Sequence, residues 1–152
     1  FDMTILYHNR SQNNQAEDDF GARYVAIDEL LSTSDFVMLT MPLTNETRGM
    51  ISTDELALMK PTAVLVNIAR GGVLDHEALL RTLKERRIFC AALDVSEPEP
   101  LPRDHPLLEM DNLVIMPHLG SATKQTRDAM ARMSVDNLFA GLESKEVPFR
   151  IV

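Results

Sequence analysis

Three residues with complementary chemistry occur in the order Arg70, Glu99 and His118, each following an apolar run of the sequence. An arginine guanidinium can hold a carboxylate in a bidentate fork and polarise the carbonyl beside it. A protonated histidine can donate a proton to that carbonyl oxygen, and a nearby carboxylate stabilises the charged histidine. These groups have the chemistry that reduction of a 2-keto acid needs, while the hydride requires a nicotinamide cofactor.

Each of the three residues also has a purely structural interpretation. Arg70 can cap a helix or pair with a surface acid, His118 can be a hydrogen-bonded core histidine, and Glu99 can be a solvated loop residue. Asp94 fits such an interpretation less well, because a buried carboxylate at the end of an apolar strand needs partners. No spacing of His, Cys, Asp and Glu is typical of a metal site, so we expect no metal.

The elements that must position these residues alternate between strands and helices. Five runs that are apolar throughout predict buried strands, over residues 3–7, 36–41, 63–68, 89–95 and 113–116. Such runs are typical of a parallel sheet covered on both faces. Residues 24–26 can add a further strand or a loop pairing. Ligands of open parallel sheets bind outside the carboxyl ends of the strands, where this topology gathers the arginine, the carboxylates and the histidine.

Helical patterns separate the strands. Four helices are predicted, over residues 28–31, 52–59, 75–87 and 121–142. Ser52 and Glu55 form a capping box at the start of the second helix, and Ser121 is the predicted N-cap of the fourth. The alternation predicts an α/β fold, a partial Rossmann-like doubly wound parallel sheet followed by a long C-terminal helix.

Composition limits the classes of function. The chain has 152 residues, 45% of them apolar and 25% charged, as in a single globular domain. A net charge of −8 disfavours nucleic acid and anionic membranes as partners. The single cysteine, Cys90, rules out an intrachain disulfide and fits a reducing compartment. We therefore expect a cytoplasmic protein that binds neither nucleic acid nor membrane.

Four ordered motifs resemble those of a known family. They are residues 42–49 (PLTNETRG), 67–72 (NIARGG), 91–100 (AALDVSEPEP) and 117–123 (PHLGSAT). With them the sequence resembles the D-isomer-specific 2-hydroxyacid dehydrogenases, and within these the glyoxylate/hydroxypyruvate reductases. The resemblance implies an enzyme that reduces a small 2-keto acid, glyoxylate or hydroxypyruvate, to the D-2-hydroxy acid, and a homodimer when intact. It also implies that Arg70 binds the substrate carboxylate, that His118 is the acid/base, and that Glu99 rather than Glu97 assists the histidine.

The same resemblance implies contacts with a cofactor. Residues expected along it are Pro42, Ile68, Asp94, which would hold the nicotinamide carboxamide, and Gly120. In a dinucleotide fold, the turn after the strand at residues 3–7 touches the adenosine ribose. There, Asn9, Arg10 and Ser11 can donate to a 2′-phosphate, and no carboxylate occurs before Glu17. We therefore expect NADPH rather than NADH; the alternative is that Arg10 is a solvated loop residue.

One element of the family pattern is missing from the 152 residues. Their six glycines form no Gly-x-Gly-x-x-Gly motif, which in the family lies just ahead of a strand like residues 3–7. We expect residues 1–117 to be a partial dinucleotide-binding domain without its first strand and Gly-rich loop. Residues 118–152 would be a C-terminal helix and tail returning toward the substrate domain. This chain alone should be inactive. The alternatives to the reductase function are a non-catalytic fragment and a binding module like the related transcriptional corepressors.

Overall fold

Two units make up the chain, Phe1–Pro117 and His118–Val152. A computed structural model describes residues 2–150. The first unit contains β1 (Leu6–Tyr7), α1 (Asn14–Phe20), β2 (Arg23–Tyr24), α2 (Ile27–Thr33), β3 (Phe36–Leu39), α3 (Thr53–Leu58), β4 (Val64–Asn67), α4 (His76–Lys84), β5 (Cys90–Leu93) and β6 (Leu113–Ile115), with short 3-10 turns at Gly71–Val73 and Pro106–Glu109. The second unit contains α5 (Lys124–Leu142).

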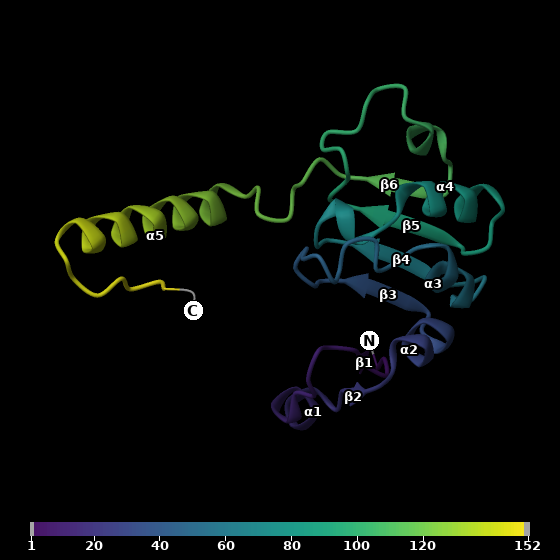
Figure 1. The fold of residues 1–152 in the computed structure, drawn as a ribbon, viewed down its shortest axis with the longest axis horizontal. Helices are drawn as coiled ribbons and strands as arrows, with labels where there is room; N and C mark the ends of the chain where they lie inside the picture. Colours follow the sequence, from purple (N-terminus) through teal and green to yellow (C-terminus); the bar gives the residue numbers. More distant parts are fainter. Residues whose placement is uncertain (1, 151–152) are drawn as a thin grey trace. The chain divides into compact units, whose positions relative to one another are not determined.

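The four central strands form one parallel sheet in the order β3-β4-β5-β6 (Figure 1). The first residues of β3, β4 and β5 are in register, with Phe36 beside Val64 and Val64 beside Cys90, whereas Leu113, the first residue of β6, lies beside Ala91. The crossovers between β3, β4 and β5 carry α3 and α4. The predicted α/β class with a Rossmann-like parallel sheet and a C-terminal helix is thereby confirmed. β1 lies within the strand predicted at residues 3–7, and β2 overlaps the possible strand at residues 24–26. The two pair in parallel as a separate two-stranded sheet, and this separation was not predicted.

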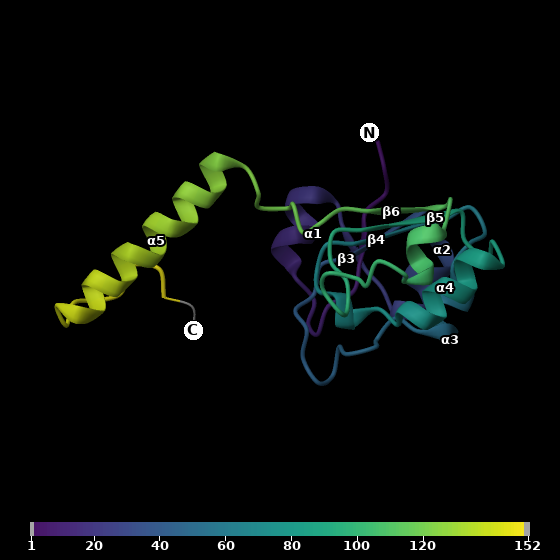
Figure 2. The ribbon, with the colours of Figure 1, turned by 90° about the horizontal axis from the view of Figure 1, so that it is seen from above.

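The two faces of the four-stranded sheet differ in burial. Helices α2, α3 and α4 lie along the same face (Figure 2), and the side chains on that face, such as Val37, Leu39 and Leu65, are at most 2% exposed. On the opposite face Phe36 and Met38 are more than half exposed. Apolar runs are typical of a sheet covered on both faces, whereas in this unit α2, α3 and α4 cover one face and leave Phe36 and Met38 of β3 exposed. An apolar run shows that both faces of a strand carry apolar side chains. Which face is covered depends on where the crossover helices pack.

Local signals fixed some helix boundaries and not others. The Ser52–Glu55 capping box is present, and α3 begins at Thr53 as predicted. Helix α4 ends at Lys84, three residues earlier than expected, and Arg86 beyond it has a left-handed φ of 50°. Helix α5 is capped by Thr123, whose hydroxyl accepts from the Thr126 amide. The predicted cap at Ser121 is therefore wrong by two residues.

Helix α1 was not predicted. Asn13 caps it by accepting a hydrogen bond from the Ala16 amide. The Glu17 carboxylate accepts hydrogen bonds from the Tyr7 hydroxyl at 2.8 Å and from the Gln12 amide at 2.9 and 3.0 Å. These bonds lower the pKa of Glu17, with Gln12 as the larger cause. Glu17, the first carboxylate after β1, is thus bonded to neighbouring side chains.

The buried core lies between the sheet and α2, α3 and α4. Leucines supply most of it, among them Leu31, Leu56, Leu65, Leu79 and Leu93, each at most 1% exposed. This packing fixes the strand ends that carry the site. Over residues 2–150, the helices lack the length and apolar character needed to cross a membrane.

Candidate active site

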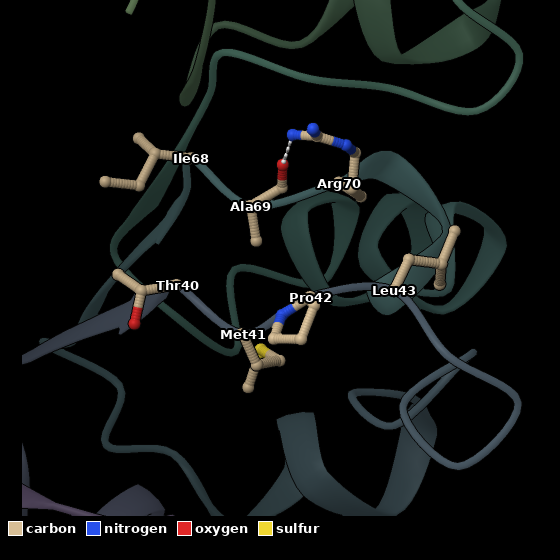
Figure 3. Close-up of a pocket in the computed structure, with 7 residues that line it drawn as sticks. All are labelled: Thr40, Met41, Pro42, Leu43, Ile68, Ala69 and Arg70. Carbon is tan, nitrogen blue, oxygen red and sulfur yellow. Dashed lines mark hydrogen bonds between the residues drawn. The ribbon is translucent and has the colours of Figure 1, made fainter. Parts of the chain in front are cut away.

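A pocket of about 530 Å³ opens between the segments that follow β3 and β4. Seven residues line it, from two short stretches: Thr40, Met41, Pro42, Leu43, Ile68, Ala69 and Arg70 (Figure 3). Because β3 and β4 are parallel neighbours, their carboxyl ends meet at one edge and bring these stretches together. The structure therefore joins three predicted site residues, Pro42, Ile68 and Arg70, in one pocket.

The backbone beneath Arg70 is held by a buried asparagine. Asn67, the last residue of β4, is fully buried. Its side-chain amide donates to the Arg70 carbonyl at 3.1 Å, and its side-chain oxygen accepts from the Ala69 amide at 3.0 Å. The exposed Arg70 guanidinium donates to the Ala69 carbonyl at 2.7 Å (Figure 3). A guanidinium has five N–H donors, so this bond leaves the group able to grip a ligand carboxylate as well.

Asp94 lies directly after β5, at the same edge of the sheet. Its backbone amide donates to the Asn67 carbonyl at 2.9 Å, which extends the pairing of β4 with β5 beyond the last strand residue. Its side chain is partly buried. Asp94 therefore borders the turn that carries Arg70.

Two glutamates follow in the loop after β5, and the structure distinguishes them. Glu97 forms an ion pair with Arg48, whose Nη1 lies 2.8 Å from one carboxylate oxygen and 3.0 Å from the other. Glu99 lies two residues further along the exposed loop. Of the two glutamates, Glu97 is thus held by Arg48.

His118 and Gly120 belong to the second unit, three and five residues after the end of β6. His118 has a left-handed backbone, with φ of 56°. This conformation costs a residue with a side chain about 1 kcal/mol or more. Backbone strain of this kind is found more often at functional sites than elsewhere. His118 lies in the exposed segment before α5.

The turn after β1 carries Asn9, Arg10 and Ser11, all exposed. The Tyr24 hydroxyl of β2 donates to the Asn9 carbonyl at 3.0 Å and so ties the turn to the neighbouring strand. Glu46 is the nearby acidic residue: the Thr44 hydroxyl is the main cause that lowers its pKa, and the charge of Arg10 lowers it further. A ligand phosphate at this turn would meet both the attraction of Arg10 and the repulsion of Glu46.

His76, the first residue of α4, is a buried titratable group. It is 8% exposed, and its Nε2 atom makes no hydrogen bond within residues 2–150. Burial lowers the pKa of His76, and the positive charge of His105 lowers it further, while Glu97 and two other acids oppose the shift. Burial therefore favours the neutral form of the ring.

Sequence reasoning missed two features of the site. Asn67 was detectable, because a polar residue at the end of an apolar strand must find partners when buried, as was argued for Asp94. The Arg48–Glu97 pair joins residues 49 positions apart, and no local pattern indicates it. Among the described residues, no group of three His, Cys, Asp or Glu could hold a metal ion.

The sequence matches a known protein family and several curated relatives. The sequence model of a family described as "D-isomer specific 2-hydroxyacid dehydrogenase, NAD binding domain" matches residues 1–120. Glyoxylate/hydroxypyruvate reductase B of Enterobacter agglomerans is 50% identical over 145 residues, 95% of this chain and 45% of the relative. Glyoxylate reductase of Pyrococcus furiosus is 49% identical over 152 residues, all of this chain and 45% of the relative.

The fold is also similar to that of a solved reductase structure. The NADPH-dependent glyoxylate/hydroxypyruvate reductase of Sinorhizobium meliloti, solved with NADP and malonate, superposes with a TM-score of 0.91 at 31% identity. The match covers 99% of this chain and 46% of that one. The chain thus spans slightly less than half the length of the relatives it matches.

Proposed function

This chain belongs to the D-isomer specific 2-hydroxyacid dehydrogenase family, and from that premise we propose that it is the cofactor-binding portion of an NADPH-dependent reductase of small 2-keto acids. The substrate in the whole protein is glyoxylate or hydroxypyruvate, and the product is the D-2-hydroxy acid. The observation that supports the proposal is the position of Arg70, which lies in the pocket after β3 and β4 on a turn held by Asn67.

Arg70 has the role of the substrate anchor. Its planar guanidinium matches the geometry of a carboxylate, and Asn67 fixes the backbone from which it extends. Malonate, a dicarboxylate, is present in the solved reductase of Sinorhizobium meliloti. Gripping the substrate carboxylate would orient the neighbouring keto group and polarise it for reduction.

His118 is the proton donor in this proposal, and Glu99 is the carboxylate that stabilises its charged form. The engagement of Glu97 by Arg48 supports the choice of Glu99. When the keto group is reduced, the histidine delivers its proton to the carbonyl oxygen; in the reverse direction it takes the proton back.

The pocket suits the nicotinamide end of a cofactor, which when bound supplies the hydride. Its wall combines the apolar side chains of Met41, Pro42 and Ile68 with the polar Thr40. Asp94 at the adjacent strand end has the acceptor oxygens that a carboxamide requires. The Gly-x-Gly-x-x-Gly motif that would hold the pyrophosphate does not occur in the 152 residues. For this reason we propose that the chain alone is inactive.

NADPH rather than NADH is the proposed cofactor. Asn9, Arg10 and Ser11 are exposed on the turn after β1 and can donate to a 2′-phosphate. The NADPH-dependent reductase of Sinorhizobium meliloti supports this choice. Glu46 near Arg10 opposes it, so the preference should be moderate.

Three further features of the whole protein follow from the same proposal. Residues 1–117 form the cofactor-binding portion, and residues 118–152 return toward the substrate domain. The intact enzyme is a homodimer. It works in the cytoplasm, where the single cysteine, Cys90, remains reduced.

The experiment is a cofactor-oxidation assay at 340 nm with glyoxylate or hydroxypyruvate, run for a full-length version and for this chain. Arg70→Ala should raise KM for the keto acid by about 10- to 100-fold, because a charged hydrogen bond is worth about 1.5–3 kcal/mol. Arg87→Ala, which removes another exposed arginine paired with Glu85, is the control and should leave KM unchanged. Absence of turnover in the full-length version would reject the reductase and favour the corepressor-like binding module.

A further inference from the structure

We propose that Arg48 and Glu97 are positioning residues for the keto acid site, and that their ion pair holds the Arg70 turn between two neighbouring loops. This inference rests on the proposed function of the same site. Neither residue lines the pocket, so their effect on the substrate passes through the backbone that carries Arg70.

The first step of the argument is the packing around the glycines that follow Arg70. Gly71 and Gly72 are both buried. A Cβ atom added to Gly71 would collide with the backbone of Ser96, and one added to Gly72 would collide with the Glu97 carboxylate. It would also lie 2.9 Å from Nη1 of Arg48. The ion pair therefore rests directly on the turn, with no room for a side chain between them.

The second step is the set of backbone bonds that join the Arg48 loop to the same turn. The Gly49 amide donates to the Gly72 carbonyl at 2.8 Å, and the Ile51 amide donates to the Val73 carbonyl at 3.1 Å. The Asp75 amide returns a bond to the Ile51 carbonyl at 2.9 Å. Residues 49–51 thus run beside residues 72–75 and place Arg48 at the edge of the turn.

The third step concerns the other ends of the two loops. The loop of Arg48 begins at the pocket wall, where the Thr47 hydroxyl donates to the Pro42 carbonyl at 2.7 Å. The Arg48 amide donates to the Thr44 carbonyl at 3.0 Å and closes this loop into a compact turn. Glu97 precedes Glu99 by two residues on the opposite loop. One ion pair therefore links the pocket wall, the Arg70 turn and the loop of Glu99, the carboxylate proposed to assist His118.

Solvent exposure argues against a role in stability alone. The side chains of Arg48 and Glu97 are 56% and 47% exposed, and exposed pairs contribute little to the free energy of unfolding. The chain offers a matched pair elsewhere: Arg86 Nη2 lies 2.8 and 3.1 Å from the two carboxylate oxygens of Asp111. Arg86 follows α4 and Asp111 precedes β6, at the opposite end of the strands. The two pairs have the same chemistry, and only one borders the site.

The test compares Glu97→Gln with Asp111→Asn in a full-length version, under steady-state conditions with glyoxylate or hydroxypyruvate. We expect Glu97→Gln to raise KM for the keto acid about tenfold with a smaller change in kcat, since small displacements of a binding group are costly. Asp111→Asn should leave both constants unchanged. Arg48→Met should match Glu97→Gln, and the double variant should lose no more than either single variant. Equal behaviour of Glu97→Gln and Asp111→Asn, or additive losses in the double variant, would overturn the proposal.

A second measurement separates this inference from the proposed function. Hydrogen exchange of the Gly49 and Ile51 amides should accelerate in Glu97→Gln and remain unchanged in Asp111→Asn. A wild-type protein that reduces neither keto acid would reject the proposed function. The exchange comparison would still decide the positioning role: faster exchange in Glu97→Gln alone supports it, and equal exchange in both variants overturns it.

Discussion

Two buried asparagines lie at opposite ends of the parallel strands, and both use their side-chain amides to hold backbone. Asn67 ends β4 and bonds to the Ala69 amide and the Arg70 carbonyl. Asn112 precedes β6, and its amide donates to the Leu83 carbonyl at the end of α4, at 3.1 Å. At the amino end of the strands, the bond from Asn112 joins the end of α4 to the residue before β6. At the carboxyl end, the bonds of Asn67 hold the turn that carries Arg70 at the edge of the pocket.

The two ends of the strands contain the same residue types, so their different roles depend on position. Both ends also contain an exposed arginine–carboxylate pair, Arg86–Asp111 at one end and Arg48–Glu97 at the other. Parallel strands point their carboxyl ends toward the loops that bind ligands, so identical chemistry has different consequences at the two ends. Changes at the amino end should alter stability alone, whereas changes at the carboxyl end should alter catalysis.

The largest expected effect belongs to His118. In a full-length version, His118→Ala should lower kcat by about 10²- to 10⁴-fold, the usual contribution of a general acid, with a smaller change in KM. Steady-state kinetics with either keto acid would measure it. Asn112→Ala, at the amino end, is the control and should leave kcat unchanged. A His118→Ala enzyme with near wild-type kcat would remove the histidine from the mechanism.

The two asparagines themselves give the next largest effect. Asn67→Ala and Asn112→Ala should each lower the free energy of unfolding by about 1–3 kcal/mol, because each leaves a buried backbone group without its partner. Denaturant titration of both variants would measure this loss. Only Asn67→Ala should also raise KM for the keto acid, since only Asn67 fixes the Arg70 backbone. A similar KM for the two variants would contradict the distinction between the strand ends.

A smaller effect is expected at the turn after β1. Arg10→Ala should weaken NADPH by about tenfold, roughly 1.4 kcal/mol, and leave NADH nearly unchanged. The value is modest because Arg10 is exposed and lies near the Glu46 charge. The ratio of kcat/KM for the two cofactors would measure it. Equal losses for both, or a wild-type preference for NADH, would show that Arg10 is a solvated loop residue.

The smallest effect is a pH dependence at His76. Burial holds the pKa of His76 below its ordinary value of 6.5, so the unfolded chain binds the proton more readily than the folded one. The contribution to stability is complete above pH 6.5 and is lost as pH falls through the lower folded pKa. Denaturant titrations between about pH 7.5 and 5.5 should show less loss in His76→Leu than in wild type. Identical pH profiles would mean that His76 does not titrate in this window.

Local sequence signals predicted much of the fold because they depend on a few adjacent residues. The Ser52–Glu55 capping box is an example, since both of its hydrogen bonds are made within one helical turn. At α5 the same kind of reasoning selected Ser121, while Thr123 makes the bond to the Thr126 amide. Several hydroxyl residues in one segment can each serve as a cap, and the one chosen depends on where the helix begins.

The sequence by itself determined the parallel strands, their apolar character and the order of Arg70, Glu99 and His118 along the chain. The tertiary structure decided which face of the sheet the helices cover, that Glu97 pairs with Arg48, and that Asn67 supports the Arg70 turn. Strand and helix patterns arise from contacts between near neighbours, which the order of residues encodes directly. A contact between residues 49 positions apart exists only after the strands have brought their loops to one edge of the sheet.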